Sequence, residues 1–258
     1  MKNIWALSAV VLKESIRRKD FYVVFVVTAI VTLVMGSVTL FHDDQIVRYL
    51  KEICLLLIWI SSLVIAITMA ARQIPTERES RTIYPLLAKP ITRTEVLLGK
   101  FLGCWLAMAV ALVAFYVFFG LVAMTKEHHW PLANYFQAVW LHWVMLGVVV
   151  AMSLLGSLLF SAVSANVTIS LVAVTFILLI GRHLDHIAVQ FGEPARSGLM
   201  GLFFILPHLE FFDVRDLVIH NWPSIHWLVC LKATAYGTVY GAFFLLAACL
   251  LFRRRSLN

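Results

Sequence analysis

Six almost purely apolar runs constrain the fold of this 258-residue chain more than any other feature of its sequence. A helix formed by the first run would be about 31 Å long, enough to cross the hydrocarbon core of a bilayer. Hydrophobic residues make up 62% of the chain and charged residues only 14%, whereas about a quarter of a soluble domain is charged. The sequence therefore predicts an all-α polytopic membrane protein with six transmembrane helices. The predicted spans are residues 21–41, 53–71, 96–124, 138–160, 167–181 and 228–252.

Three further segments carry patterns that do not fit a span. Residues 3–19 alternate apolar side chains with lysines and arginines, a pattern typical of a helix that lies in the membrane interface. Residues 199–206 are apolar but too short to cross, so we expect a re-entrant or interfacial segment before the last span. Residues 206–220 mix charged and apolar side chains and predict an amphipathic outer helix. We expect residues 1–258 to form a single transmembrane domain without a nucleotide-binding domain.

The distribution of charge predicts how the chain is oriented in the membrane. Six spans place both termini on one side, together with the loop between the second and third spans. That side carries 14 of the 21 lysines and arginines, and the other side carries 9 of the 14 acidic residues. Cytoplasmic loops of membrane proteins are enriched in lysine and arginine. We therefore expect a multi-pass protein of the cell membrane with both termini in the cytoplasm.

Residues 72–103 form a dense polar island between the second and third predicted spans. Thr76 with Glu79 and Thr92 with Glu95 have the spacing of capping boxes, which mark the first turn of a helix. Two prolines between these pairs prevent one long helix from forming. We therefore expect a short amphipathic helix, a break, and a new helix that enters the bilayer.

An apolar patch, formed by Ile83, Leu86 and Leu87, lies among the charges of this island. Exposed apolar residues ringed by charge favour recognition of a protein partner. A solvated loop, basic only to set the topology, explains the same charges. The residues predicted to dock a partner are Glu77, Arg78, Glu79, Arg81, Thr82, Ile83, Leu86, Leu87, Lys89 and Arg93.

The run E-R-E-S-R-T-I-Y-P-L-L-A-K-P-I-T-R, followed by L-L-G-K-F-L-G, resembles the loop after the second span of ABC-2-type transporter permeases. In that family this segment is the coupling helix that contacts the ATPase subunit. Two positions depart from the usual pattern, since Arg81 replaces a glycine and Pro85 an acidic residue. Residues 206–220 also resemble an element of permeases grouped with copper-enzyme maturation systems.

The resemblance implies a function and a set of partners. The chain would be the permease subunit of an ATP-driven exporter, working as a homodimer or with a second permease in membrane lipid. A separate ATPase subunit would bind ATP and magnesium, and this chain would hold no cofactor. No nucleic acid partner is expected.

The residues themselves agree with a non-enzymatic role. The chain has no G-x-x-x-x-G-K-[ST] motif for phosphate binding. No aspartate, glutamate, lysine or arginine lies in the predicted span interiors, which disfavours an ion-coupled secondary carrier. A non-transporting membrane anchor or assembly factor remains an alternative.

Small residues recur at helical spacing in two predicted spans. Ser153, Ser157 and Ser161 follow one another every four residues, and Gly237 and Gly241 form a G-x-x-x-G motif. Both patterns are typical of close helix packing. A polar transport pathway is the alternative interpretation.

Histidine is unusually frequent near the predicted outer side. His128, His129, His183 and His186 are candidate metal ligands because imidazole binds metals readily. No C-x-x-C or H-E-x-x-H motif accompanies them, so interfacial or solvated histidines are the favoured interpretation.

Overall fold

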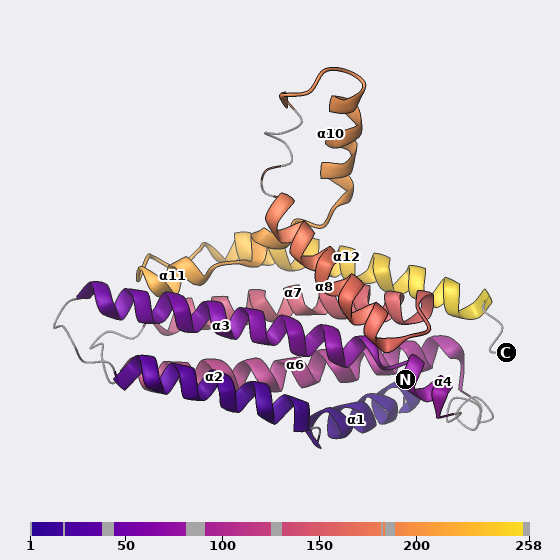
Figure 1. The fold of residues 1–258 in the computed structure, drawn as a ribbon, viewed down its shortest axis with the longest axis horizontal. Coiled ribbons are helices and arrows are strands. Elements are labelled where there is room, and N and C mark those ends of the chain that lie inside the picture. The colour runs from indigo at the N-terminus through magenta and orange to yellow at the C-terminus, as the bar shows by residue number, and fades with distance from the viewer. Residues whose placement is uncertain are drawn as a thin grey trace.

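The computed structural model describes residues 2–17, 19–37, 44–80, 91–124, 131–181, 183 and 189–254. Within these residues all regular structure is helical, which confirms the all-α prediction, and the long helices form an elongated bundle (Figure 1). The helices are α1 (Lys2–Arg17), α2 (Lys19–Ser37), α3 (Asp44–Ala71), α4 (Pro75–Glu79), α6 (Arg93–Met124), α7 (Leu132–Leu159), α8 (Val163–Ile180), α10 (Ala195–Ile205), η1 (Leu209–Phe212), α11 (Arg215–Ile219) and α12 (Trp227–Arg254).

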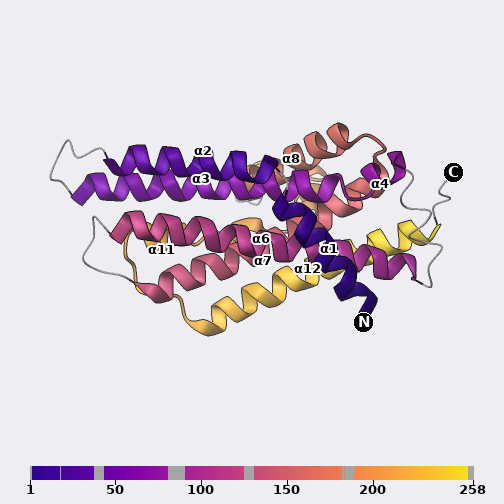
Figure 2. The same cartoon turned by 90° about the horizontal axis from the view of Figure 1, so that it is seen from below.

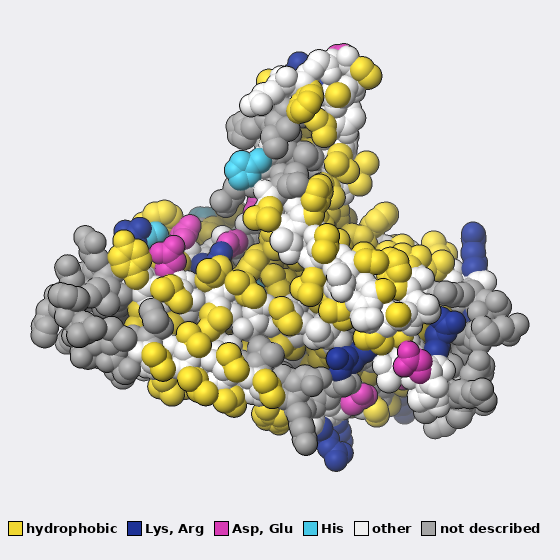
Figure 3. All heavy atoms as spheres, in the orientation of Figure 1, with side chains coloured by type: hydrophobic (Ala, Val, Ile, Leu, Met, Phe, Trp, Pro, Cys, Tyr) yellow, Lys and Arg dark blue, Asp and Glu magenta, His cyan; other side chains and the backbone are white. Residues whose placement is uncertain are grey.

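Four helical segments of the described chain are long and apolar enough to cross a membrane, and they include α6, α7 and α12 in full. The fourth runs through α3 and α4, over residues 48–79. Shorter apolar stretches occupy Phe25–Val34 in α2 and Val163–Leu179 in α8. On the face shown in Figure 3, hydrophobic side chains cover most of the middle of the bundle, and charged ones gather toward its ends. A polytopic membrane protein is confirmed, while the number of six spans stays a prediction.

Helix α7 lies at the centre of the bundle and packs against α3, α6, α8 and α12. In its most apolar window 72% of the residues are buried, compared with 28% for α12. Met145, Leu146 and Val150 of α7 are fully buried in the main core. The apolar face of α12 is therefore largely free to contact lipid.

The N-terminal helix α1 crosses α6 obliquely near the end of the bundle where both termini lie (Figure 2). Two glycines of α6 make this crossing possible. A Cβ atom at Gly99 would lie 2.6 Å from Leu7 Cβ, and one at Gly103 would lie 2.6 Å from Val11 Cβ. Small residues four positions apart let two helix backbones approach closely. In the sequence these two glycines belong to the run L-L-G-K-F-L-G, which predicts no packing role for them.

Helix α3 begins at Asp44, whereas the predicted span begins at residue 53, so the helix extends beyond the apolar run. Contacts with a distant part of the chain explain this extension of the helix. Lys51 is fully buried, and its ammonium donates hydrogen bonds to the carbonyl of Val218 at 3.1 Å and to Asn221 Oδ1 at 3.2 Å. A lysine in such a site is satisfied without water, and the helix continues beyond the apolar run.

The segment before α12 differs from the sequence prediction in one respect. Helix α10 covers the short apolar stretch, stands out from the bundle in Figure 1, and has no buried residue. The prediction of one amphipathic helix over residues 206–220 is wrong, because η1 and α11 are separate. Asp213 accepts hydrogen bonds from the backbone N–H of Arg215 at 3.4 Å and from Arg215 Nε at 2.7 Å. This local turn separates the two short helices.

Candidate functional site

The polar island predicted to dock a partner lies at the end of the bundle that carries both termini (Figure 1). Helix α4 occupies its first part, and a buried ion pair fixes α4 to α6. The ammonium of Lys100 lies 2.6 Å from Glu77 Oε1 and also donates to the carbonyl of Gln73 at 3.0 Å. The Lys100 side chain is only 3% exposed. Breaking a buried ion pair by removing one partner typically costs about 3–5 kcal/mol, so this contact holds α4 firmly.

The two predicted capping boxes have different outcomes. Thr92 and Glu95 form one at the start of α6: Thr92 N donates to Glu95 Oε2 at 2.8 Å, and Glu95 N donates to Thr92 Oγ1 at 3.2 Å. The box predicted for Thr76 and Glu79 is wrong, because α4 begins at Pro75 without a side-chain cap. Proline is well suited to the first helical position, since its missing N–H would have no partner there.

Arg93 fixes the start of α6 to the end of α12. Its guanidinium donates to the carbonyl of Phe252 at 2.8 Å and lies 5.7 Å from the centre of the Phe252 ring. In the opposite direction, Arg253 Nε donates to Thr94 Oγ1 at 3.3 Å. The last carbonyls of a helix lack partners within it, and Arg93 supplies one. Any displacement of residue 93 is therefore transmitted to both α6 and α12.

Six of the predicted docking residues lie outside the described residues: Arg81, Thr82, Ile83, Leu86, Leu87 and Lys89. Of the other four, Glu77 and Arg93 make the contacts above, Arg78 is half-buried and Glu79 is exposed. The structure thus describes both flanks of the predicted patch, and each flank is bonded to a long helix.

An open hollow of about 640 Å³ lies beside α4, between the end of α3 and the start of α8. Arg72 and Glu79 contribute charged groups to its walls, and Thr68, Ser164 and Thr168 contribute hydroxyl groups. The hollow therefore presents charged and hydroxyl groups beside apolar side chains.

Asn166 joins three helices next to this hollow. Its Nδ2 donates to the carbonyl of Ala71 at 3.1 Å and to that of Ser153 at 3.2 Å. Gly156 is required for this contact, because a Cβ atom there would lie 2.2 Å from Asn166 Oδ1. Nothing in the sequence close to Asn166 indicates these partners, which lie 95 and 13 positions away.

The structure separates the three serines predicted to share one face. Ser153 and Ser157 are fully buried in α7, and Ser157 Oγ donates to the carbonyl of Leu154 at 2.6 Å. Ser161 lies beyond the end of α7 and is exposed. Gly237 packs tightly, since a Cβ atom there would lie 2.7 Å from Val144 Cγ1, whereas Gly241 faces open space. The choice between packing and a pathway stays a prediction.

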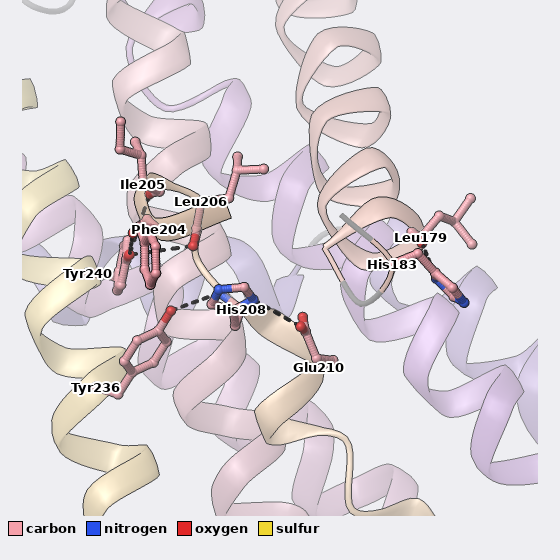
Figure 4. Close-up of polar contacts among 9 residues, drawn as sticks. All are labelled: Leu179, His183, Phe204, Ile205, Leu206, His208, Glu210, Tyr236 and Tyr240. Atoms are coloured by element: carbon pink, nitrogen blue, oxygen red, sulfur yellow. Dashed lines mark hydrogen bonds and ion pairs between the residues drawn. The ribbon is translucent and has the colours of Figure 1, made fainter. Parts of the chain in front are cut away.

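The candidate metal ligands are described only in part, because His128, His129 and His186 lie outside the described residues. His183 is exposed, and its Nδ1 lies 3.2 Å from the carbonyl of Leu179 (Figure 4). The His208 ring points toward Glu210, with Nδ1 3.0 Å from Glu210 Oε1. Within the described part of the chain, no three or more histidine, cysteine, aspartate or glutamate residues are placed to hold a metal ion.

His142 is a buried polar residue of α7. Its Nε2 lies 2.8 Å from Ser62 Oγ, and its Nδ1 lies 3.3 Å from the hydroxyl of Tyr116. These contacts join α3, α6 and α7 inside the bundle, where a polar side chain without a partner would be costly.

A bundle of long apolar helices, with a bonded polar segment at one end, defines a multi-pass membrane protein. Comparison with protein families gives the particular class: residues 2–257 match the family described as "ABC-2 family transporter protein". The chain therefore belongs to the ABC-2 family of transporter proteins. No curated protein matches the chain.

Membership of this family identifies the chain as a membrane permease subunit of an ABC transporter. Permeases of this family work with ABC ATPase subunits, are generally non-enzymatic, and typically carry no cofactor of their own. The resemblance to the copper-enzyme maturation sub-group stays a prediction.

Proposed function

We propose that this chain is the permease of an ATP-driven exporter, in which residues 72–93 receive movement from a separate ATPase. Two such permease domains pair around a central path, either as a homodimer or with a second permease. Both termini face the cytoplasm of the cell membrane, and residues 1–258 act as one transmembrane domain. ATP and magnesium bind to the partner, and no residue of this chain performs covalent chemistry.

The observation that carries this proposal is the bonding of both flanks of the apolar patch. On one flank, Glu77 is paired with Lys100 of α6; on the other, Arg93 is bonded to the end of α12. A force applied between these flanks reaches α6 and α12 directly. The ATPase can then favour one arrangement of the helices over another, and this difference in stability drives a conformational change.

The hollow beside α4 supports the same location for the ATPase contact. It opens next to Glu79, and Arg72 supplies a positive charge within the same walls. We propose that the partner seats Ile83, Leu86 and Leu87 in its own apolar cleft and covers this hollow with a polar segment. Each fully buried aliphatic side chain would stabilise docking by about 1.5–3 kcal/mol.

The test is the double variant Leu86→Asp and Leu87→Asp in the full chain, expressed with the candidate ATPase. Charged side chains in the patch would release the ATPase on purification or separate ATP hydrolysis from transport. The comparison variant is Arg78→Gln at the charged rim of the patch, which should weaken docking far less than the double variant, because exposed or half-exposed charges typically contribute only about 0–1 kcal/mol.

Insertion of the double variant must be checked first, by its amount in the membrane fraction and its elution as a folded protein. Normal co-purification and normal coupled activity in an inserted double variant would contradict the coupling assignment.

A further inference from the structure

A carbon-lined groove of about 180 Å³ lies between α6, α7 and α12. Phe101 and Trp105 of α6 and Val144 of α7 form part of its walls, and Gly241 of α12 leaves space on the opposite side. No heavy atom lies within 4 Å of a Cβ placed at Gly241, so the groove is open at this point.

The groove offers no free hydrogen-bonding side chain to a ligand. Thr238 lines it, but the hydroxyl of Thr238 donates to the carbonyl of Ala235 at 2.8 Å. The indole N–H of Trp105 donates to the carbonyl of Trp143 at 3.0 Å. A polar group seated here would lose its bonds to water without replacement, so the occupant must be apolar.

Helices α6 and α12 carry positive charge at the end of the bundle where α6 begins and α12 ends. Arg253 and Arg254 of α12 are exposed, and Arg93 of α6 is half-buried beside them, with Arg253 bonded to Thr94. The neighbouring carboxylate of Glu95 is bonded to Thr92 in the capping box. The seam between α6 and α12 is therefore positively charged at its end and apolar further in.

The spacing of these features along α12 fits one lipid molecule. Leu245 and Gly241 both line the groove and lie eight and twelve positions before Arg253, or about 12 and 18 Å along a helix. Half of a hydrocarbon core is about 15 Å thick, so the groove lies at the depth of acyl chains when the arginines lie at the headgroups. The exposed apolar side chains of Leu246 and Leu250 lie along α12 between the groove and the arginines.

We propose that a phospholipid with an anionic headgroup binds in the seam between α6 and α12. Its phosphate contacts Arg253 and Arg254, and one acyl chain occupies the groove beside Trp105 and Gly241. Basic pockets between transmembrane helices are a known way of selecting anionic headgroups. None of the residues named for this site belongs to the patch formed by Ile83, Leu86 and Leu87, and the proposal does not depend on the coupling proposal.

The test uses the purified full chain in nanodiscs of phosphatidylcholine that contain dibrominated lipid. Bromine on an acyl chain quenches tryptophan fluorescence on contact, and Trp105 lines the groove. Dibrominated phosphatidylglycerol should quench more than dibrominated phosphatidylcholine with the same chains at the same fraction. Trp105→Phe should abolish most of this difference, which identifies Trp105 as the reporter.

Two kinds of variant separate the acyl chain from the headgroup. Gly241→Leu fills the groove, where its Cβ meets no neighbouring atom, and should abolish the excess quenching. Gly201→Leu, at an equally open position on α10, is the matched control and should leave it unchanged. In the double variant Arg253→Gln and Arg254→Gln, brominated phosphatidylglycerol should quench no more than brominated phosphatidylcholine. Quenching by phosphatidylcholine should persist.

Equal quenching by the two lipids in the unmodified protein would overturn the proposal. Excess quenching that survives Gly241→Leu would overturn it as well. The absence of quenching by either brominated lipid, because a second copy of the chain covers the seam, would also overturn it. If Gly241→Leu does not fold, Gly241→Ala narrows the same groove and should reduce the excess.

Discussion

Trp105 of α6 and Trp143 of α7 donate hydrogen bonds to each other's backbone. Trp105 Nε1 lies 3.0 Å from the carbonyl of Trp143, and Trp143 Nε1 lies 2.9 Å from the carbonyl of Trp105. Their rings stack with centres 4.2 Å apart and planes 9° apart. Both partly buried indole N–H groups thus have a hydrogen-bond partner inside an apolar bundle, where an unbonded N–H would be costly.

Gly147 leaves the space that this pair needs, because a Cβ atom there would lie 2.8 Å from Trp105 Nε1. We expect Gly147→Ala to break the bond from Trp105 and to lower the free energy of unfolding by about 1–3 kcal/mol, the cost of an unsatisfied buried donor. Thermal unfolding in detergent measures the effect, with Gly201→Ala as the control. Equal unfolding temperatures for the two variants would show that the pair does not stabilise the bundle.

Glu77→Gln leaves the buried ammonium of Lys100 without its carboxylate. We expect a loss of about 3–5 kcal/mol, as for other buried ion pairs that lose one partner. Glu77→Leu with Lys100→Met replaces both charges by apolar groups and should recover much of that loss. Thermal unfolding of the single and double variants forms the test, and equal losses in both would argue against an energetic coupling between the two residues.

The same pair gives a functional prediction for the assembled transporter. If α4 transmits movement to α6 through Glu77, then Glu77→Gln should leave the ATPase bound while weakening the effect of the permease on ATP hydrolysis. Glu193→Gln, at an exposed position outside the predicted docking residues, should change neither quantity. If the two variants change ATPase activity equally, movement is not transmitted through Glu77.

Gly103→Leu should displace α1 from α6, because no side chain fits between Gly103 and Val11. Lys13 of α1 is exposed, and trypsin should cleave after it faster once α1 is detached. Cleavage rates of the variant and of Gly201→Leu, followed by mass spectrometry, provide the comparison. An unchanged rate at Lys13 would mean that α1 tolerates the wider spacing.

Acid should weaken the segment between α10 and α12 through Asp213. Burial alone would raise the pKa of the Asp213 carboxyl, but the hydrogen bonds and positive charge of Arg215 outweigh it and hold that pKa below its ordinary value. A carboxyl with a lowered pKa stabilises the fold above its unfolded pKa, near 3.9, and that contribution is lost as the pH falls through the folded value.

Asp213→Asn should therefore cost about 1.5–3 kcal/mol at pH 7, the range for hydrogen bonds to charged groups. The variant should also lose less stability than the unmodified protein when the pH is lowered below 4. Asp216→Asn, an exposed aspartate on α11, is the control in thermal unfolding across this range. Parallel curves for the unmodified protein and Asp213→Asn would exclude this carboxylate as a source of the acid sensitivity.

The orientation is tested by labelling with a membrane-impermeant thiol reagent in intact cells. In a background without the native cysteines, Thr82→Cys and Ser256→Cys should be protected and Glu193→Cys should react. The prediction follows from the excess of basic residues on the side of the termini. Labelling at position 82 without lysis would reverse the orientation.

The sequence by itself determined the class of the protein, its helical character and the start of α6. These features depend on residues close in the chain: a run of apolar side chains must leave water, and Thr92 caps α6 with a partner three positions away. The cap predicted at Thr76 failed for a reason that is also local, since Pro75 occupies the first helical position. The apolar runs likewise predicted all four segments that are long enough to cross a membrane.

Only the tertiary structure decided which polar groups meet across the bundle. Lys100 meets Glu77, Asn166 meets the carbonyl of Ala71, and Trp105 meets Trp143, each over a separation that no local pattern specifies. Such partners depend on how each helix is rotated about its axis and how closely neighbouring helices approach. Packing of side chains around α7 determines both quantities, and hydropathy along one chain does not encode them.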